Sequence, residues 1–428
     1  MNLLKLISVS SLMLGLSFIL RFLLTLTFAR FLDPNQLGIY SWSVTAFGIM
    51  GIIVNFGLDF FLIRKIPEYR NKNISKIGSV IQHTKEQTKF NTILVSSIII
   101  PLGYFSAYFF EGATQYNSEL MIITLALPFA AYLMIFSTSL RAFDEPLTGQ
   151  FIESILQTAI LLIAVLIFFN VFNSVTPEYK RTLQLVGLFL FSWISSCFIA
   201  GYIYKKKLNL SEYSPAKRKN TKDWRKDQAT IMFGVLGWSF LGRSDVFLLA
   251  FLVPPSDVGG YFICIRLAET LMFFGSVSYY VWGGEISNLI QQSKLGKAQE
   301  ILRKSSQLCF TTTFIMTLIA WIYAAEILYF MNEQFVDYEL IFKGALLVFF
   351  LKGSQGILNP IYYILGEQTF LAKLQWIVGL FFTVSVILTV PIYGISACIM
   401  SLGICQAIYL LILVFRLKFK HGLSMLPF

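Results

Sequence analysis

The chain has 428 residues, of which 56% are hydrophobic and only 13% are charged. Soluble domains carry about 25% charged residues, so this composition excludes an ordinary soluble domain and indicates a protein that lies in lipid. The formal net charge of +11 would suggest nucleic-acid binding in a soluble protein. In a membrane protein the positions of Lys and Arg report topology instead, and we expect anionic lipids rather than nucleic acid as their partners.

Twelve apolar segments are long enough to cross a bilayer. Helices are the expected element, because open strands cannot satisfy their backbone in lipid. We predict an all-α polytopic membrane protein with spans near residues 4–31, 38–63, 89–110, 118–142, 147–170, 182–204, 229–252, 259–283, 306–325, 337–363, 370–390 and 392–416.

The Lys and Arg residues of the connections predict the orientation. With the N-terminus inside, the cytoplasmic segments hold 26 of them, including seven in 64–89 and nine in 205–226. The opposite loops hold only Lys180 and Arg181. The positive-inside rule therefore predicts cytoplasmic N- and C-termini.

An internal repeat divides the chain into two halves. "ARFLDPNQLGIY" begins at Ala29 and "AFLVPPSDVGGY" at Ala250, so Pro34, Gly38 and Tyr40 match Pro255, Gly259 and Tyr261 at a constant offset of 221. Six predicted spans separate the copies, so the halves have the same orientation. We predict two parallel six-helix lobes, 1–204 and 229–428, joined by a basic cytoplasmic linker at 205–228, an arrangement typical of transporters. The alternative is that Pro-x-x-x-Gly-x-Tyr is only a favoured short turn.

Charged residues inside the predicted spans are the candidate binding residues, because a charge at membrane depth is costly without a partner or a function. The positive ones, which we expect to line a hydrated cavity between the lobes, are Arg21, Arg243, Arg266, Lys343 and Lys352. The acidic candidates for ion coupling are Asp59, Asp245 and Glu269. The spacing of Arg266 and Glu269 lets them touch on one helix face, whereas Arg243 and Asp245 point to different sides. The excess of cations predicts an anionic ligand such as phosphate or carboxylate; the alternative is an ion-pair network that only holds the bundle together.

Aromatic side chains near these charges are candidates for stacking on sugar rings. They are Tyr279, Tyr280, Trp282, Tyr362 and Tyr363. Tyr and Trp also form interfacial belts in membrane proteins, so both uses remain open.

Sequence signatures of enzymes are missing. There is no GxxxxGK[ST], HExxH or GxSxG motif, and the two histidines, His83 and His421, lie outside the predicted spans. The five cysteines lie singly in apolar runs. We therefore expect no catalysis, no metal and no cofactor.

Two stretches carry a family resemblance. They are "LTLTFARFLDPNQLGIYSWSVTAFGIMGIIVNFGLDFFLIRKI" and "RSDVFLLAFLVPPSDVGGYFICIRLAE". They resemble polysaccharide-biosynthesis flippases of the multidrug/oligosaccharidyl-lipid/polysaccharide exporter superfamily, in particular Wzx-type translocases of O-antigen and capsule synthesis.

The resemblance implies a MATE-like fold of twelve helices in two lobes. It also implies a cargo of undecaprenyl-pyrophosphate-linked repeat units, flipped to the outer leaflet of the bacterial cytoplasmic membrane beside a polymerase and other glycan-assembly proteins. The five cations above are then expected to hold the pyrophosphate or acidic sugars. Two other functions stay open: a cation-coupled multidrug exporter of the same superfamily, and a non-transporting scaffold of a glycan-assembly complex.

Overall fold

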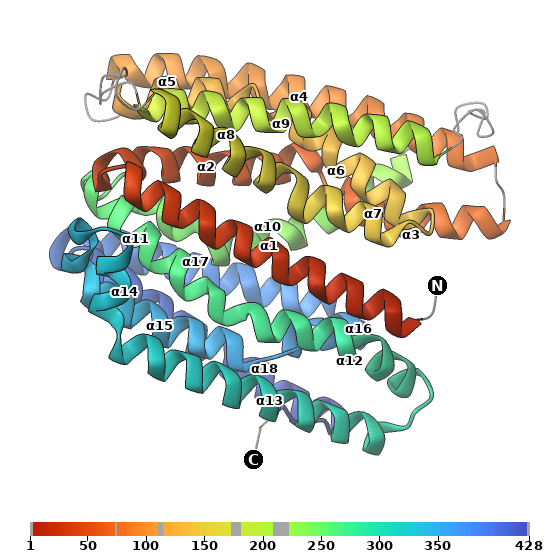
Figure 1. Cartoon of the computed structure of the whole chain (residues 1–428). Helices are drawn as coiled ribbons and strands as arrows, with labels where there is room; N and C mark the ends of the chain where they lie inside the picture. The colour runs from red at the N-terminus through yellow and green to blue at the C-terminus, as the bar shows by residue number, and fades with distance from the viewer. Residues whose placement is uncertain (1–2, 73–74, 110–113, 173–180, 209–221, 426–428) are drawn as a thin grey trace. The chain divides into compact units, whose positions relative to one another are not determined.

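The computed structural model describes residues 3–72, 75–109, 114–172, 181–208 and 222–425. Every regular element in these ranges is a helix, as Figure 1 shows, which confirms the all-α class. Ten helices of the described residues are long and apolar enough to span a bilayer, so the protein is a multi-pass membrane protein.

The predicted number of twelve spans is approached but not confirmed. A helical pair, Trp224–Gly237 and Gly242–Leu249, bent by 65°, gives an eleventh candidate and corresponds to the predicted span 229–252. The predicted span 89–110 lies on α4 (Ser75–Phe109), a helix of 35 residues that is not among the ten.

The helices form two compact units. One comprises Met1–Phe18, Phe28–Gly38 and Gly237–Phe428 and is called the C-terminal unit; the other comprises Ile19–Thr27 and Ile39–Leu236 and is called the N-terminal unit. Helices α1 (Leu3–Phe31), α2 (Pro34–Asn55) and α10 (Lys222–Leu249) contribute to both. The predicted lobes at 1–204 and 229–428 stay a prediction, and residues 209–221 of the predicted linker lie outside the described residues.

The N-terminal unit is built around α6, which packs against α3, α7 and α9. Its buried core includes Phe61, Leu140 and Ile152. Besides α4 its helices are α2 (Pro34–Asn55), α3 (Leu58–Lys72), α5 (Thr114–Thr124), α6 (Leu127–Ala142), α7 (Pro146–Phe151), η2 (Ile152–Leu156), α8 (Gln157–Phe172) and α9 (Arg181–Lys207).

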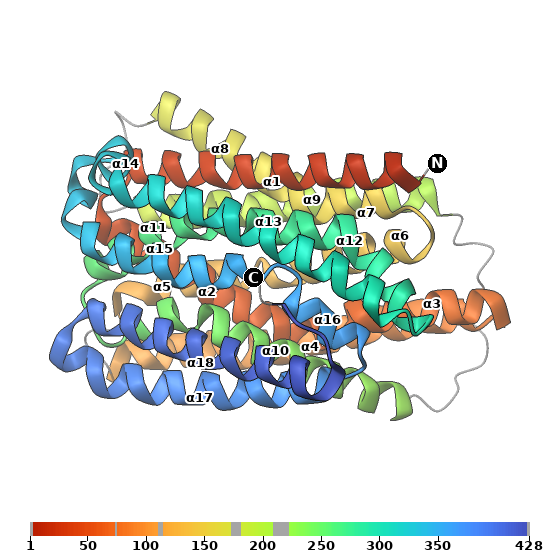
Figure 2. The same cartoon turned by 90° about the horizontal axis from the view of Figure 1, so that it is seen from below.

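The C-terminal unit is built around α15, which packs against α11, α13 and α18; Figure 2 shows these helices from below. Its elements are α11 (Pro255–Ala268), η5 (Glu269–Met272), α12 (Phe273–Gln291), α13 (Leu295–Ile322), α14 (Ala324–Met331), η6 (Glu333–Tyr338), α15 (Glu339–Ser354), α16 (Leu358–Ile364), α17 (Gln368–Tyr393) and α18 (Ile395–His421).

Several segments predicted as single spans are broken helices. The predicted span 259–283 is divided by the short 3₁₀ turn η5, and 337–363 is divided between α15 and α16, where Gly356 has a φ of 55°. The span 38–63 is divided between α2 and α3 at Phe56 and Gly57, which both have positive φ. Broken spans are tolerated in a membrane protein where neighbouring groups satisfy the freed backbone.

The two copies of the sequence repeat contact each other within the C-terminal unit. Pro34 and Pro255 each begin a helix, at a position where a missing N–H costs nothing. A β-carbon on Gly38 would lie 1.8 Å from the Pro255 carbonyl oxygen, and one on Gly259 would lie 2.0 Å from the Pro34 carbonyl oxygen. The matched positions are therefore reciprocal in space, and glycine is required at both.

Gly38→Ala and Gly259→Ala are each expected to destabilise the protein by about 1–3 kcal/mol or more, because the added methyl overlaps a backbone oxygen that cannot rotate away. Thermal unfolding of the purified protein measures the loss. Gly51→Ala is the matched control: it lies in α2 with nothing within 4 Å of its β-carbon position, so it is expected to be neutral or stabilising. Equal behaviour of the three variants would contradict the contact.

A single carboxylate ties the turn between α16 and α17 to the end of α18. Glu367 is buried and accepts hydrogen bonds from Lys420, from Arg416 Nε at 2.8 Å and from His421 Nε2 at 3.1 Å. These donors, Lys420 first, lower the pKa of Glu367 from its ordinary value of 4.5 to about 2.

Glu367→Gln is expected to lower the unfolding temperature at about neutral pH, because the three donors lose their charged acceptor. A lowered pKa contributes stability above 4.5 that is lost as the pH falls towards about 2. The difference between wild type and variant should therefore shrink over that interval, in thermal melts recorded as a function of pH. Glu300→Gln, which removes an exposed i,i+4 pair with Lys304, is the control and should change little.

Candidate functional site

Five of the predicted charged residues come together in the C-terminal unit. They are Arg243 and Asp245 on α10, Arg266 at the end of α11, Glu269 at the start of η5 and Lys352 in the last turn of α15. We call this group the charged cluster. Its members interact electrostatically: Glu269 with Arg266, Arg243 and Lys352, and Asp245 with Lys352 and Glu269.

Asp245 is the buried member of the cluster, 5% exposed. Its Oδ2 accepts a hydrogen bond from the Tyr261 hydroxyl at 2.8 Å, and its Oδ1 accepts one from the Val246 N–H at 2.8 Å. Tyr261 is itself buried and lies 3.7 Å from Cys398 Sγ. Arg243, two residues earlier on α10, is exposed, as the i,i+2 spacing predicts.

Glu269 is the shared carboxylate of the cluster. Arg266 Nη1 donates to Glu269 Oε2 at 2.7 Å, so the predicted i,i+3 contact is confirmed. Arg266 also lies 4.9 Å from the Phe262 ring, and Lys352 Nζ lies 4.7 Å from the Phe349 ring, in the range of cation–π contacts. Three cations therefore share two carboxylates, which leaves the cluster with a formal charge of +1.

Helix breaks bring the cluster together. Glu269 begins η5, which separates α11 from α12, and η5 packs against α15. A β-carbon on Gly353, the residue after Lys352, would lie only 2.9 Å from the Leu271 carbonyl oxygen, so glycine permits this close approach. The end of α15, with its lysine, is thereby held against the turn that carries the glutamate.

Three predicted site residues are not brought into the cluster. Lys343 pairs with Glu339 at 2.6 Å and lies 5.8 Å from the Trp321 ring; nine residues of α15 separate it from Lys352, about 13.5 Å along the axis. Arg21 is exposed on the part of α1 that belongs to the N-terminal unit. Asp59 lies in the first turn of α3, also in the N-terminal unit.

The predicted stacking residues have different environments. The Tyr362 ring is fully buried and its hydroxyl donates to the Leu413 carbonyl at 2.6 Å, so it anchors α16 to α18. Tyr279 and Tyr363 are exposed by 46% and 55%, and Trp282 is half-buried. The side chain of Tyr280 lies outside the described residues.

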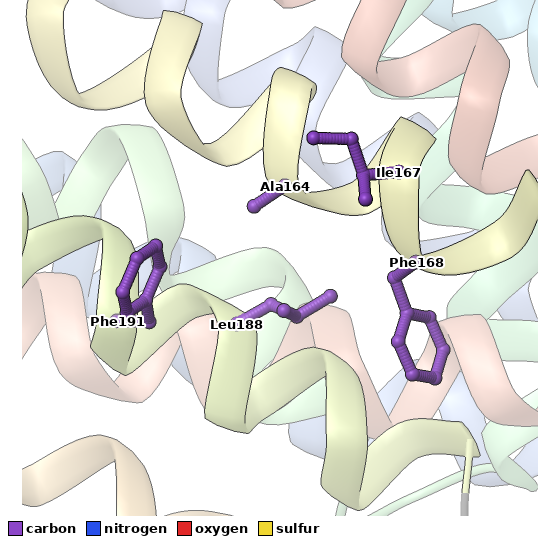
Figure 3. Close-up of a pocket in the computed structure, with 5 residues that line it drawn as sticks. All are labelled: Ala164, Ile167, Phe168, Leu188 and Phe191. Carbon is purple, nitrogen blue, oxygen red and sulfur yellow. The ribbon is translucent and has the colours of Figure 1, made fainter. Parts of the chain in front are cut away.

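A separate apolar pocket lies between α8 and α9 in the N-terminal unit. Figure 3 shows its lining side chains, Ala164, Ile167, Phe168, Leu188 and Phe191, and its volume is about 320 Å³. The lining offers no polar side chain, so the pocket suits a hydrocarbon chain rather than an anionic headgroup.

Tyr261 and Cys398 are the members of this site that sequence reasoning missed. In the sequence Tyr261 stands out only as a matched position of the repeat. Neither Tyr261 nor Cys398 is charged, so neither stands out as a charged residue inside a predicted span. The available signal was the buried aspartate itself, because a buried carboxylate requires a hydrogen-bond donor from a neighbouring helix.

The family model described as "Polysaccharide biosynthesis protein" matches residues 3–281. The chain belongs to this family. Among curated proteins, an uncharacterized membrane protein of Methanocaldococcus jannaschii is 23% identical over 256 residues. That match covers 56% of this chain and 49% of the relative, so the chain spans about half the length of the curated relative it matches.

Solved structures of two transporter groups share the fold of this chain. An inward-facing multidrug resistance MATE family transporter of the MOP superfamily has a TM-score of 0.76 at 10% identity, over 95% of this chain and 94% of that chain. Lipid II flippase MurJ has a TM-score of 0.72 at 13% identity, over 97% and 87%.

A MOP superfamily transporter from Pyrococcus furiosus, whose structure is described as having a binding pocket of reverse polarity, has a TM-score of 0.61 at 13% identity, over 96% and 95%. These similarities confirm the MATE-like fold predicted from the resemblance.

Glu269→Gln is expected to destabilise the protein by about 1–3 kcal/mol, because it removes the charged acceptor that Arg266 uses and leaves three cations around a neutral group. Arg266→Gln in the same chain should recover part of the loss, since it removes one of the repelling cations. A double-mutant cycle on unfolding temperatures measures the coupling, expected to exceed about 0.5 kcal/mol. Strict additivity would show that the pair does not hold η5 in place.

Proposed function

We propose that this protein flips undecaprenyl-pyrophosphate-linked oligosaccharide repeat units from the inner to the outer leaflet of the bacterial cytoplasmic membrane, during the synthesis of O-antigen or capsule. A charged oligosaccharide cannot cross about 30 Å of hydrocarbon unaided, so the pathway needs a protein that shields the headgroup. Alternating access through a cationic cavity performs this step, with both termini of the chain in the cytoplasm.

The charged cluster is the observation that carries the proposal. Its three cations hold a formal excess of +1 over Asp245 and Glu269, in a protein of the polysaccharide biosynthesis family. Guanidinium groups bind phosphate oxygens in pairs, and a pyrophosphate offers more charge than a single carboxylate.

Exchange of anionic partners explains how the cluster tolerates both an empty and a loaded state. In the empty state Glu269 satisfies Arg266, so this guanidinium is not left without a carboxylate in the membrane. An arriving pyrophosphate competes with this carboxylate for the guanidinium. Because one anion replaces another, Arg266 keeps an anionic partner while the ligand binds and leaves.

The two arginines are the residues to test, because their guanidinium groups can bind the oxygens of a tetrahedral phosphate in pairs. Arg243→Gln together with Arg266→Gln is expected to reduce surface polysaccharide about tenfold or more, since each hydrogen bond to a charged group contributes about 1.5–3 kcal/mol. The measurement is polysaccharide extracted from cells whose own gene is deleted, at matched membrane levels of the protein. Arg266→Lys, which keeps the charge but not the paired donors, should give an intermediate loss.

Lys343→Gln serves as the matched control, because Lys343 is paired with Glu339 away from the cluster. Its surface polysaccharide should stay close to that of wild type. Normal polysaccharide in the double arginine variant, at normal protein level, would favour a scaffold that transports nothing. Loss in the control equal to that in the arginine variants would assign the effect to stability rather than to binding.

A multidrug exporter shares this fold, so fold alone does not separate the two functions. The net positive charge of the cluster disfavours a cationic drug as ligand. Accumulation of a fluorescent cationic dye, compared in cells with and without the protein, decides between them. Equal accumulation supports the flippase, and dye extrusion overturns it.

A further inference from the structure

A second group of charges lies in the N-terminal unit and has no part in binding an anion. Its members are Asp59 in the first turn of α3, Arg141 in the last turn of α6, and Glu153 in η2. Asp59 and Arg141 are half-buried, Glu153 is exposed, and α6 packs against both α3 and η2. We call these three residues the acidic triad, because two of them are carboxylates.

The arginine of the triad is committed to the glutamate. Arg141 Nη2 lies 2.6 Å from Glu153 Oε2, and the Ser137 hydroxyl donates to the same oxygen at 3.3 Å. Gly149 fixes this geometry, since a β-carbon there would lie 2.5 Å from Arg141 Cγ and from the Ser137 carbonyl oxygen. The carboxylate of Glu153 is therefore held by two donors on α6.

Asp59 is the member that backbone N–H groups, rather than side chains, support among the described residues. It interacts electrostatically with Glu153 and Arg141, but its Oδ1 is buried and receives no hydrogen bond. The Nε of Arg141 is likewise buried without an acceptor. Two carboxylates and one guanidinium leave the triad with a formal charge of −1, which is costly among apolar helices unless a positive charge arrives.

Within the described part of the chain, the neighbouring basic side chains have other partners or are exposed. On α3, Lys65 pairs with Glu68. At the turn after α6, Asp144 pairs with Arg70 and Glu145 with Lys207 of α9. On α4, Lys76 Nζ lies 5.2 Å from the Tyr69 ring, and His83 Nε2 lies 3.3 Å from the Gln228 side chain of α10. The other described basic side chains of these faces are exposed: Arg64 on α3, Lys85 and Lys89 on α4, and Arg225 and Lys226 on α10.

The backbone around the triad departs from a regular α-helix at two places. Glu153 lies in η2, a single π-helical turn, a feature found frequently at functional sites. Asp59 follows the break between α2 and α3, where Phe56 has a φ of 50°, a conformation that a bulky side chain adopts only under strain. The charge of Asp59 thus lies two residues after a break whose geometry it can influence.

We propose that the acidic triad is a proton-binding site, in which Asp59 takes up one proton from water and releases it to water. The neutral carboxyl donates its O–H towards Glu153, which stays ionised on Arg141 and Ser137. The ionised carboxylate instead interacts with the first backbone N–H groups of α3, as an acid at a helix N-terminus does. Protonation therefore exchanges one partner of Asp59 for another and biases the break at Phe56 and Gly57.

The use of this proton to drive translocation rests on the function proposed above, whereas proton binding itself does not. The test of binding is labelling of the full-length protein, in lipid nanodiscs, with dicyclohexylcarbodiimide, which reacts with protonated carboxyl groups in apolar surroundings. Peptide mass spectrometry locates and quantifies the adduct. Samples at about pH 6 and about pH 9 bracket the change, because each pH unit alters the protonated fraction of an ionising group up to tenfold.

Asp59 is expected to carry the adduct at about pH 6 and to lose it at least about fivefold at about pH 9. Glu153→Gln should lower labelling of Asp59 severalfold, because Arg141 is then released to pair with Asp59. Asp144→Asn, which removes an exposed carboxylate at the end of α6, is the matched control and should leave labelling unchanged. Asp59→Asn should fold normally and lose the adduct.

Two results would overturn the proton site. The first is that Asp59 is unlabelled at both pH values. The second is that sodium chloride reduces the labelling of Asp59 whereas a change of pH does not, which would assign the triad to a sodium ion. In cells, Asp59→Asn at normal protein level is expected to reduce surface polysaccharide severalfold. Labelling as expected with unchanged polysaccharide would retain the proton site and reject its coupling to the proposed function. If the labelling alone fails, the function proposed above, binding and flipping of a pyrophosphate-linked oligosaccharide, is not affected.

Discussion

A charge inside a hydrocarbon bilayer is stable only beside a partner, and this constraint explains the local arrangement of both units. In the C-terminal unit Glu269 is the partner of Arg266 and lies near Arg243 and Lys352, while Asp245 is satisfied by Tyr261 and a backbone amide. In the N-terminal unit Arg141 and Glu153 satisfy each other. The named residues of each unit nevertheless have a formal charge that is not zero, and this charge rather than the pairing indicates a ligand.

Helix breaks decide where these charges meet. Glu269 begins η5, Lys352 lies in the last turn of α15 and Asp59 lies in the first turn of α3, so three of the charges lie within one turn of an interruption. An interrupted helix presents N–H and C=O groups that a continuous helix would use internally, and it allows close approach at residues such as Gly353. Polar backbone and ionisable side chains thereby gather at the same places in an otherwise apolar bundle.

Hydropathy and residue spacing predicted the larger features, because lipid imposes them on the chain. The all-helical class, the contact of Arg266 with Glu269 and the opposite orientations of Arg243 and Asp245 all follow from local periodicity. The reciprocal contact of Gly38 and Gly259 gives the sequence repeat a spatial meaning. The Gly and Pro residues of 353–360 permit the break between α15 and α16, where Gly356 has a positive φ. The breaks at η5 and at Phe56, the pairing of Lys343 with Glu339 and the burial of Tyr362 were missed, because they depend on which helices pack together rather than on composition.

The sign of each imbalance separates the two charged groups by chemistry. The five residues of the cluster in the C-terminal unit carry a formal charge of +1, which favours an anion such as a phosphate as the ligand. The triad in the N-terminal unit has one carboxylate too many, and a proton neutralises it without requiring further space. A transporter that takes an anionic headgroup out of water and across the membrane needs two kinds of group. One binds the cargo, and the other binds an ion whose gradient supplies the free energy. The proposed headgroup site and the proposed proton site lie in different units, so we expect a substitution in one to abolish its own binding while the other remains intact.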